Sequence, residues 1–204
     1  MVNITLYKNR EKLSGFSLVV GKIFGRLGLS ANVWTGLALV LTALTGYFLI
    51  KQEFALAFIF FIVAAFLDSV DGAVARFRKE ASKLGSYYDT ISDRYMEGII
   101  ALALLLVALP SFYLPSYFWI ALYLFGSMTI TYAKAAAKEK ELTKTEIRGG
   151  LLERPERLIL LAVGILLANF SLLYFIYVIV LLAVLCNITA LQRFWIAVKT
   201  AKKH

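Results

Sequence analysis

Long apolar runs divide this chain, and they constrain its fold more than any other feature. They cover about residues 32–50, 54–75, 95–109, 117–133 and 158–192. A helix needs roughly 20 apolar residues to cross a bilayer, and at ~1.5 Å per residue the last run is longer than a ~30 Å hydrocarbon core. We therefore expect this run to fold back at residues 169–171. The pattern predicts an all-α integral membrane bundle of six transmembrane helices.

The composition agrees with a membrane protein. Hydrophobic residues make up 60% of the 204 residues and charged residues 17%, and the mean hydropathy is +0.75. A soluble domain of this length is much more polar. The sequence contains no linker-like tract, so we expect a single membrane domain.

Lysine and arginine alternate from one side of the predicted bundle to the other. They collect in residues 1–31, 76–83, 134–157 and 193–203, while the other connections hold only Lys51 or none. The positive-inside rule places both termini and the two basic loops in the cytoplasm. The net charge of +9 then suits anionic lipid headgroups and phosphorylated substrates, and no nucleic-acid partner is expected.

The segment before the first apolar run has a different character. Residues 13–29 carry Lys22 and Arg26 among apolar residues, a pattern typical of an amphipathic helix on a membrane surface. We therefore divide the chain into a juxtamembrane segment at 1–31, a membrane domain at 32–195 and a cytoplasmic tail at 196–204.

The aspartates carry the strongest functional signal. All four lie within 26 residues, as the pairs Asp68 and Asp71, three apart, and Asp89 and Asp93, four apart. Each pair shares a helix face, and ionised carboxylates near a bilayer need compensating cations. Oxygen ligands select Mg²⁺ or Mn²⁺ over zinc, and two such ions about 3.5–4 Å apart can bridge a diphosphate. We expect a metal-dependent phosphoryl-transfer site at the cytoplasmic face.

The alternative is that the aspartates cap helices or pair with nearby cations such as Arg76 and Arg78. Capping explains one or two of them, but not two helix-periodic pairs in so short a stretch. Arg76 can either pair with a carboxylate or hold a phosphate. Glu97, one turn after Asp93, can orient Asp93 or pair with Arg94.

The whole stretch resembles the signature of the CDP-alcohol phosphotransferase family. That signature, D-x2-D-G-x2-A-R-x8-G-x3-D-x3-D, is matched at every specified position from Asp68 to Asp93. The resemblance implies a six-helical membrane enzyme, often a homodimer, that uses CDP-activated lipid. It implies that the four aspartates bind two metal ions and that Asp93 is the general base. It further implies a CDP-binding set of Asp68, Asp71, Gly72, Ala75, Arg76, Gly85 and Ser86.

The chain departs from the family pattern in one place. A Pro-Asn-x-x-Thr run is common before the first helix of the family, and here Ala31 replaces the proline before Asn32 and Thr35. Asn32 and Thr35 are candidates to face the nucleotide. A helix N-cap is an equally good interpretation of Asn32.

Cations at other predicted helix ends indicate the acceptor. Lys134, Arg154, Arg157 and Arg193 come from three helix ends, and Pro155 suits a first helical turn. Converging cations favour an acceptor with its own phosphate, although the positive-inside rule also places single cations there.

These segments are similar to those of phosphatidylinositol-phosphate and archaetidylinositol-phosphate synthases. The resemblance implies that Thr131, Lys134, Arg154, Arg157 and Arg193 bind the phosphate of inositol phosphate. The expected reaction transfers a phosphatidyl or archaetidyl group to that acceptor and releases CMP. Glycerol phosphate, serine or another alcohol is the alternative acceptor. A cation transporter is a remote alternative, because it predicts acidic residues nearer mid-span.

Overall fold

The computed structural model describes residues 10–143 and 150–202. Within these residues the secondary structure is helical, apart from one isolated bridge between Phe112 and Leu114. The helices are α1 (Arg10–Gly25), α2 (Ala31–Ile50), α3 (Phe54–Phe77), α4 (Lys83–Leu105), α5 (Ser116–Glu139), α6 (Arg154–Ala168) and α7 (Leu172–Ala201). The predicted all-α class is confirmed.

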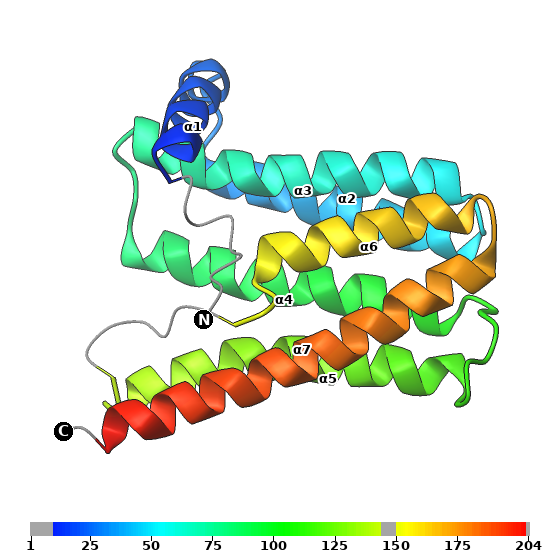
Figure 1. Cartoon of the computed structure of the whole chain (residues 1–204). Helices are drawn as coiled ribbons and strands as arrows, with labels where there is room; N and C mark the ends of the chain where they lie inside the picture. Colours follow the sequence, from blue (N-terminus) through cyan, green and yellow to red (C-terminus); the bar gives the residue numbers. More distant parts are fainter. Residues whose placement is uncertain (1–9, 144–149, 203–204) are drawn as a thin grey trace. The chain divides into compact units, whose positions relative to one another are not determined.

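The described residues form two compact units, divided between Val107 and Ala108. Helices α1 to α4 belong to the first unit and α5 to α7 to the second (Figure 1).

In the first unit, α3 packs against both α1 and α2, and α2 also packs against α4. Val20 of α1 is buried against Val70 and Val74 of α3, and Trp34 of α2 joins the same cluster. The predicted amphipathic segment is therefore helical, and one of its faces is covered by α3. Burying apolar side chains on this face stabilises the position of α1.

Helix α4 starts well before the apolar run at residues 95–109. Ser82 is its N-cap, and the Ser82 hydroxyl accepts a 3.0 Å hydrogen bond from the Gly85 backbone N–H. The cap satisfies one of the donors that a helix start leaves unpaired. As a result, Asp89 and Asp93 lie within a continuous helix that begins six residues before Asp89.

In the second unit, α7 packs against α5 and α6. Asn187 on α7 donates to the backbone carbonyl of Leu122 on α5 at 2.9 Å. Gly126 allows this close packing, because a Cβ there would lie 2.6 Å from Asn187 Nδ2 and 2.9 Å from Cys186 Cβ.

The predicted fold-back at residues 169–171 is confirmed. Helix α6 ends at Ala168, and Ser171 caps α7 by accepting from the Leu173 backbone N–H at 3.2 Å. Helix α7 continues to Ala201. It therefore extends beyond the apolar run that ended at residue 192, through the proposed domain boundary at 195.

The start of α6 is fixed by a capping box. The side chain of Glu153 accepts from the third helical residue, and Glu156 accepts from the Glu153 backbone N–H at 3.2 Å. Pro155 lies in the first turn, as predicted. The preceding residue, Leu152, donates its N–H to Thr189 Oγ1 on α7 at 3.1 Å.

Three of the described helices, α2, α3 and α7, are long and apolar enough to cross a membrane. Aromatic residues gather where α5 and α7 begin: Phe112 lies 5.3 Å from Tyr177 between ring centroids, and Trp119 donates to the Phe112 carbonyl at 2.9 Å. Tryptophan and tyrosine are enriched at the two interfaces of a membrane.

Candidate functional site

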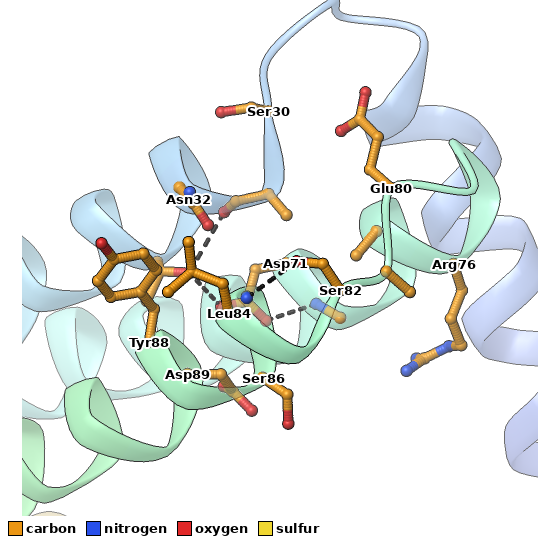
Figure 2. Close-up of a pocket in the computed structure, with 16 residues that line it drawn as sticks. Ser30, Asn32, Asp71, Arg76, Glu80, Ser82, Leu84, Ser86, Tyr88 and Asp89 are labelled. Carbon is orange, nitrogen blue, oxygen red and sulfur yellow. Dashed lines mark hydrogen bonds between the residues drawn. The ribbon is translucent and has the colours of Figure 1, made fainter.

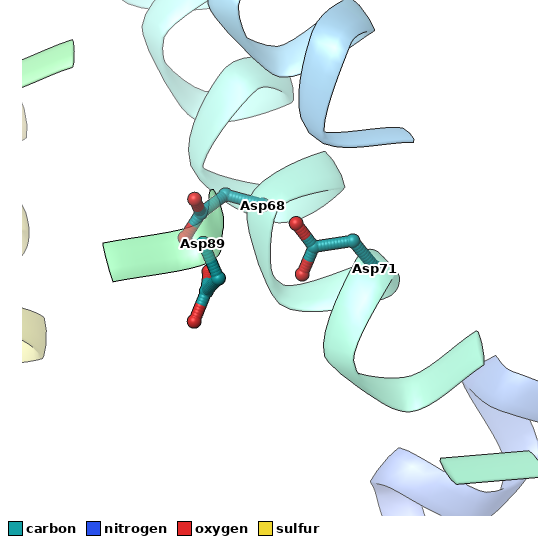
Figure 3. A group of neighbouring side chains, drawn as sticks. All are labelled: Asp68, Asp71 and Asp89. Carbon is teal, nitrogen blue, oxygen red and sulfur yellow. The ribbon is translucent and has the colours of Figure 1, made fainter. Parts of the chain in front are cut away.

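Three of the four aspartates, two on α3 and one on α4, bring their carboxylates together. One carboxylate oxygen from each of Asp68, Asp71 and Asp89 lies within 4.8 Å of the others (Figure 3). Asp68 and Asp71 are buried, and Asp89 is half-buried. Like charges this close repel, and desolvation raises the cost of keeping them ionised. A divalent cation relieves both costs, and an all-carboxylate set is what Mg²⁺ and Mn²⁺ prefer.

Asp71 is held from two sides. Thr35 Oγ1 on α2 donates to Asp71 Oδ2 at 2.5 Å, and the Gly72 backbone N–H donates to Asp71 Oδ1. These bonds fix the direction of the carboxylate, as the partners of metal ligands do in other metal sites. The predicted Thr35 is therefore part of the site despite the missing proline. The N-cap interpretation of Asn32 is wrong, because Ser30 is the N-cap of α2 and Asn32 lies within its first turn.

Asp93 lies one turn further along α4, outside the group of three. Its Oδ2 is 3.8 Å from Arg94 Nη2, and Arg94 Nη1 is 2.8 Å from Glu97 Oε2. Of the two roles open to Glu97, pairing with Arg94 is therefore observed.

A cavity of about 370 Å³ opens beside the aspartates (Figure 2). This volume is within the range of small-molecule sites. The predicted residues that line it are Asn32, Thr35, Asp71, Gly72, Ala75, Arg76, Gly85, Ser86 and Asp89. Most of the predicted nucleotide set thus lines one cavity, and Asp71 and Asp89 belong both to its wall and to the carboxylate group. Asp68, predicted for both sets, is in the carboxylate group but is not among the lining residues.

The cavity wall also contains residues that the sequence reasoning missed. They are Ser30, Ala31, Glu80, Ala81, Ser82, Leu84 and Tyr88. Ser30 and Ser82 are N-caps, so the wall includes the first turns of α2 and α4. Unpaired backbone N–H groups and the helix dipole favour anions at such ends. A serine before each helical pattern was the signal in the sequence.

Among the described residues, the nearby cations Arg76 and Arg78 have partners other than Asp71. Arg76 Nη2 donates to Ser17 Oγ at 2.8 Å, and Arg78 pairs with Glu80 at 2.8 Å. Asp71 accepts instead from Thr35 and Gly72. A purely ion-paired role for the Asp71 carboxylate is therefore wrong.

The predicted acceptor residues lie in the second unit. Arg157 on α6 and Arg193 on α7 are buried, and they donate to the backbone carbonyls of Ser127 (3.2 Å) and Ile130 (3.1 Å) on α5. Thr131 and Lys134 follow on α5, half-buried, and Arg154 is the first residue of α6. Arg157 and Arg193 are thus anchored to neighbouring turns of α5, about two turns and one turn before Lys134.

Comparison with known proteins identifies the family. Residues 29–200 match the family described as CDP-alcohol phosphatidyltransferase. The chain is 31% identical to the archaetidylinositol phosphate synthase of Pyrococcus horikoshii over 194 residues, which cover 95% of this chain and 97% of the relative.

Solved structures agree. The phosphatidylinositol phosphate synthase of Mycobacterium tuberculosis with CDP-DAG bound superposes with a TM-score of 0.76 at 25% identity, covering 89% of this chain and 92% of that one. The same enzyme in complex with manganese and citrate gives a TM-score of 0.76 at 26% identity, covering 91% and 88%. With its aspartate group, its adjoining cavity and a family match over most of its length, the chain belongs to the CDP-alcohol phosphatidyltransferase family of enzymes.

Proposed function

We propose that this enzyme transfers a phosphatidyl or archaetidyl group from a CDP-linked lipid to inositol phosphate and releases CMP in phospholipid biosynthesis. The observation that carries the proposal is the shared cavity, in which carboxylates suited to hard cations adjoin two helix N-termini and Arg76. Such a cavity offers cation sites and anion-binding groups side by side, which a diphosphate needs. The names of the similar proteins, phosphatidylinositol and archaetidylinositol phosphate synthases, supply the acceptor.

The metal set comprises Asp68, Asp71, Asp89 and Asp93, for two Mg²⁺ or Mn²⁺ ions. The carboxylates of the first three fit such ions by chemistry and spacing, and a relative is solved with manganese. When bound, the ions neutralise the diphosphate and the oxygens that gain charge in the transition state. Asp93, one turn from Asp89, lies outside the tight group of three and is the residue that we assign to the acceptor hydroxyl.

The donor is held by residues around the cavity. Asn32, Thr35, Gly72, Ala75, Arg76, Gly85 and Ser86 take the CDP moiety together with Asp68 and Asp71. Gly72 and Gly85 let phosphates approach the backbone closely, and the first turn of α4 presents its N–H groups to an anion.

In the reaction, Asp93 accepts the proton of an acceptor hydroxyl. The resulting oxygen forms a bond to the lipid-side phosphorus, and the bond from that phosphorus to the bridging diphosphate oxygen breaks. CMP leaves with the bonding electrons. General-base assistance of this kind contributes roughly 10²–10⁴-fold to rate.

The acceptor phosphate is bound by Thr131, Lys134, Arg154, Arg157 and Arg193. The burial of Arg157 and Arg193 and their bonds to α5 carbonyls support this assignment, because they fix the guanidinium planes before a ligand arrives. Arginine then offers a fork matched to phosphate oxygens.

The membrane arrangement follows the charge pattern. We infer six crossings by α2 to α7, a surface position for α1 within residues 1–31, both termini in the cytoplasm, and a tail from residue 196. The three apolar helices and the aromatic group at the starts of α5 and α7 support crossing. The active site then opens to the cytoplasm, where nucleotide and sugar phosphate arrive from water. We further propose that the enzyme is a homodimer.

The test is CMP release by the purified full chain from CDP-diacylglycerol and its diether analogue. Inositol phosphate is compared with free inositol, glycerol phosphate and serine, each with Mg²⁺ or Mn²⁺. Release that depends on inositol phosphate supports the proposal. Faster release with glycerol phosphate or serine would identify that alcohol as the acceptor in place of inositol phosphate. No release with any acceptor would refute the transferase reaction.

A further inference from the structure

Helix α1 lies very close to α3 because the contacting residues of α1 are small. A Cβ on Gly21 would lie 2.6 Å from the carbonyl oxygen of Ala73, and a Cβ on Gly25 would lie 2.6 Å from Phe77 Cδ1. Small residues allow helix backbones to approach in this way. Ser17, Gly21 and Gly25 recur every four residues, so they share one face of α1.

Ser17, on that face, contacts a residue of the family signature. Arg76 Nη2 donates to Ser17 Oγ at 2.8 Å, between residues 59 positions apart in the chain. The same guanidinium lies against Gly72, where a Cβ would be 3.3 Å from Arg76 Nη1. Arg76 is thus held by a hydroxyl from α1 and rests on its own helix one turn back.

Arg76 has a distinct place in the cavity. Among the described residues that line it, Arg76 is the only lysine or arginine, and Asp71, Glu80 and Asp89 supply carboxylates (Figure 2). A guanidinium is a planar fork of donors, so its orientation decides which phosphate oxygens it meets. The Ser17 hydroxyl uses one donor and thereby sets that plane.

We propose that Ser17 is a positioning residue for the donor substrate, holding Arg76 in the orientation that receives a phosphate of the CDP-linked lipid. This inference rests on the function proposed above. It makes α1 a supporting part of the donor site. The other side of α1 exposes Leu18, Val19 and Ile23, which suits a lipid surface, so one helix joins the membrane surface to the nucleotide site.

The experiment compares Ser17→Ala and Ser17→Thr in the full-length chain, with Val19→Ala as a control on the exposed side of α1. Ser17→Ala is expected to raise KM for CDP-diacylglycerol about tenfold, the effect of losing one hydrogen bond to a charged group. The kcat and the KM for inositol phosphate stay unchanged. Ser17→Thr, which keeps the hydroxyl, and Val19→Ala behave as wild type.

A second comparison separates positioning from folding. In an Arg76→Ala background, Ser17→Ala is expected to add no further rise in donor KM, because it acts through the guanidinium. In the otherwise wild-type chain, Ser17→Cys keeps the size of the side chain but offers a weaker acceptor, so its donor KM is expected to lie between those of wild type and Ser17→Ala. Additive effects of Ser17→Ala and Arg76→Ala would overturn the inference, as would equal donor KM values for Ser17→Ala and Val19→Ala.

Calorimetric titration of CDP-diacylglycerol into the solubilised protein keeps this test independent of turnover. A wild type that binds this donor but releases no CMP contradicts the proposed function. Weaker binding to Ser17→Ala than to Val19→Ala still supports the role of Ser17, and equal binding overturns it.

Discussion

The hydroxyl of Thr35 on α2 donates a 2.5 Å hydrogen bond to the carboxylate of Asp71 on α3. Thr35 is buried, and its bond reaches one of three carboxylates whose oxygens cluster within 4.8 Å. Helix α2, which lies outside the Asp68–Asp93 signature, therefore fixes the direction of the Asp71 carboxylate, a proposed metal ligand. Partners of this kind typically change metal affinity or activity about 10–100-fold when removed.

We expect Thr35→Val to lower kcat/KM for CMP release at least about tenfold and to raise the Mn²⁺ concentration needed for half-maximal activity. Valine keeps the shape of threonine but cannot donate to Asp71. The measurement is a Mn²⁺ titration of activity. Thr35→Ser is the matched control and should stay near wild type; a Thr35→Val enzyme with an unchanged Mn²⁺ requirement would argue against this role.

Asp93→Asn should reduce turnover by about 10²–10⁴-fold while donor binding is largely kept. An amide cannot accept the proton of the acceptor hydroxyl. Asp68→Asn should instead raise the Mn²⁺ concentration needed for half-maximal activity and also weaken donor binding. Rates of CMP release and calorimetric titration of the donor separate the two variants. Near-normal turnover by Asp93→Asn would contradict the assignment of Asp93 as the general base.

Chelation with EDTA should abolish CMP release, and added Mg²⁺ or Mn²⁺ should restore it. The clustered carboxylates are hard oxygen ligands, which these ions prefer. Zn²⁺, which favours nitrogen and sulfur ligands, should restore little activity. The measurement is CMP release after dialysis against each ion; activity that survives EDTA would contradict a metal-dependent reaction.

Lys134→Gln should raise KM for inositol phosphate about tenfold or more and leave donor KM unchanged, because a charge-assisted contact to phosphate is lost. Lys138→Gln, one turn later and exposed, is the matched control for charge on α5. Steady-state kinetics with each substrate varied in turn provides the measurement. Equal effects of the two variants would show that only the general positive charge of α5 matters.

Gly126→Ala should destabilise the second unit by about 1–3 kcal/mol, the usual cost of overpacking. The new methyl would meet Asn187 Nδ2 at 2.6 Å and disturb the bond from Asn187 to α5. Gly36→Ala is the control, since a Cβ there meets nothing within 4 Å and alanine favours a helix. Thermal melting in detergent should show a lower midpoint for Gly126→Ala alone.

Local patterns in the sequence predicted most of the helices. The fold-back at residues 169–171 followed from the length of an apolar run, and Ser171 supplies the cap that makes it sharp. The aspartate spacing already placed Asp89 and Asp93 in a helix, but the apolar run began only at residue 95, because hydropathy reports the part of a helix that lies in lipid and the first half of α4 is polar. The spacing of Asp89 and Asp93 and the capping Ser82 were the available signals.

Contacts between distant residues were not predictable in the same way. The spacing of the four aspartates predicted one carboxylate cluster, and the structure brings together three of them, Asp68, Asp71 and Asp89. The family signature added Arg76 as a candidate, and the family's Pro-Asn-x-x-Thr pattern added Thr35. No periodicity pairs Thr35 with Asp71 or Ser17 with Arg76, because each bond joins separate helices. Such pairs depend on how the helices pack, which a single sequence does not encode in its spacing.

The first turns of α2 and α4 line the cavity. Their backbone N–H groups are permanent, whereas divalent ions exchange with the surrounding solution. A weakened part of the affinity for the nucleotide phosphates should therefore persist when magnesium or manganese becomes scarce and catalysis stops.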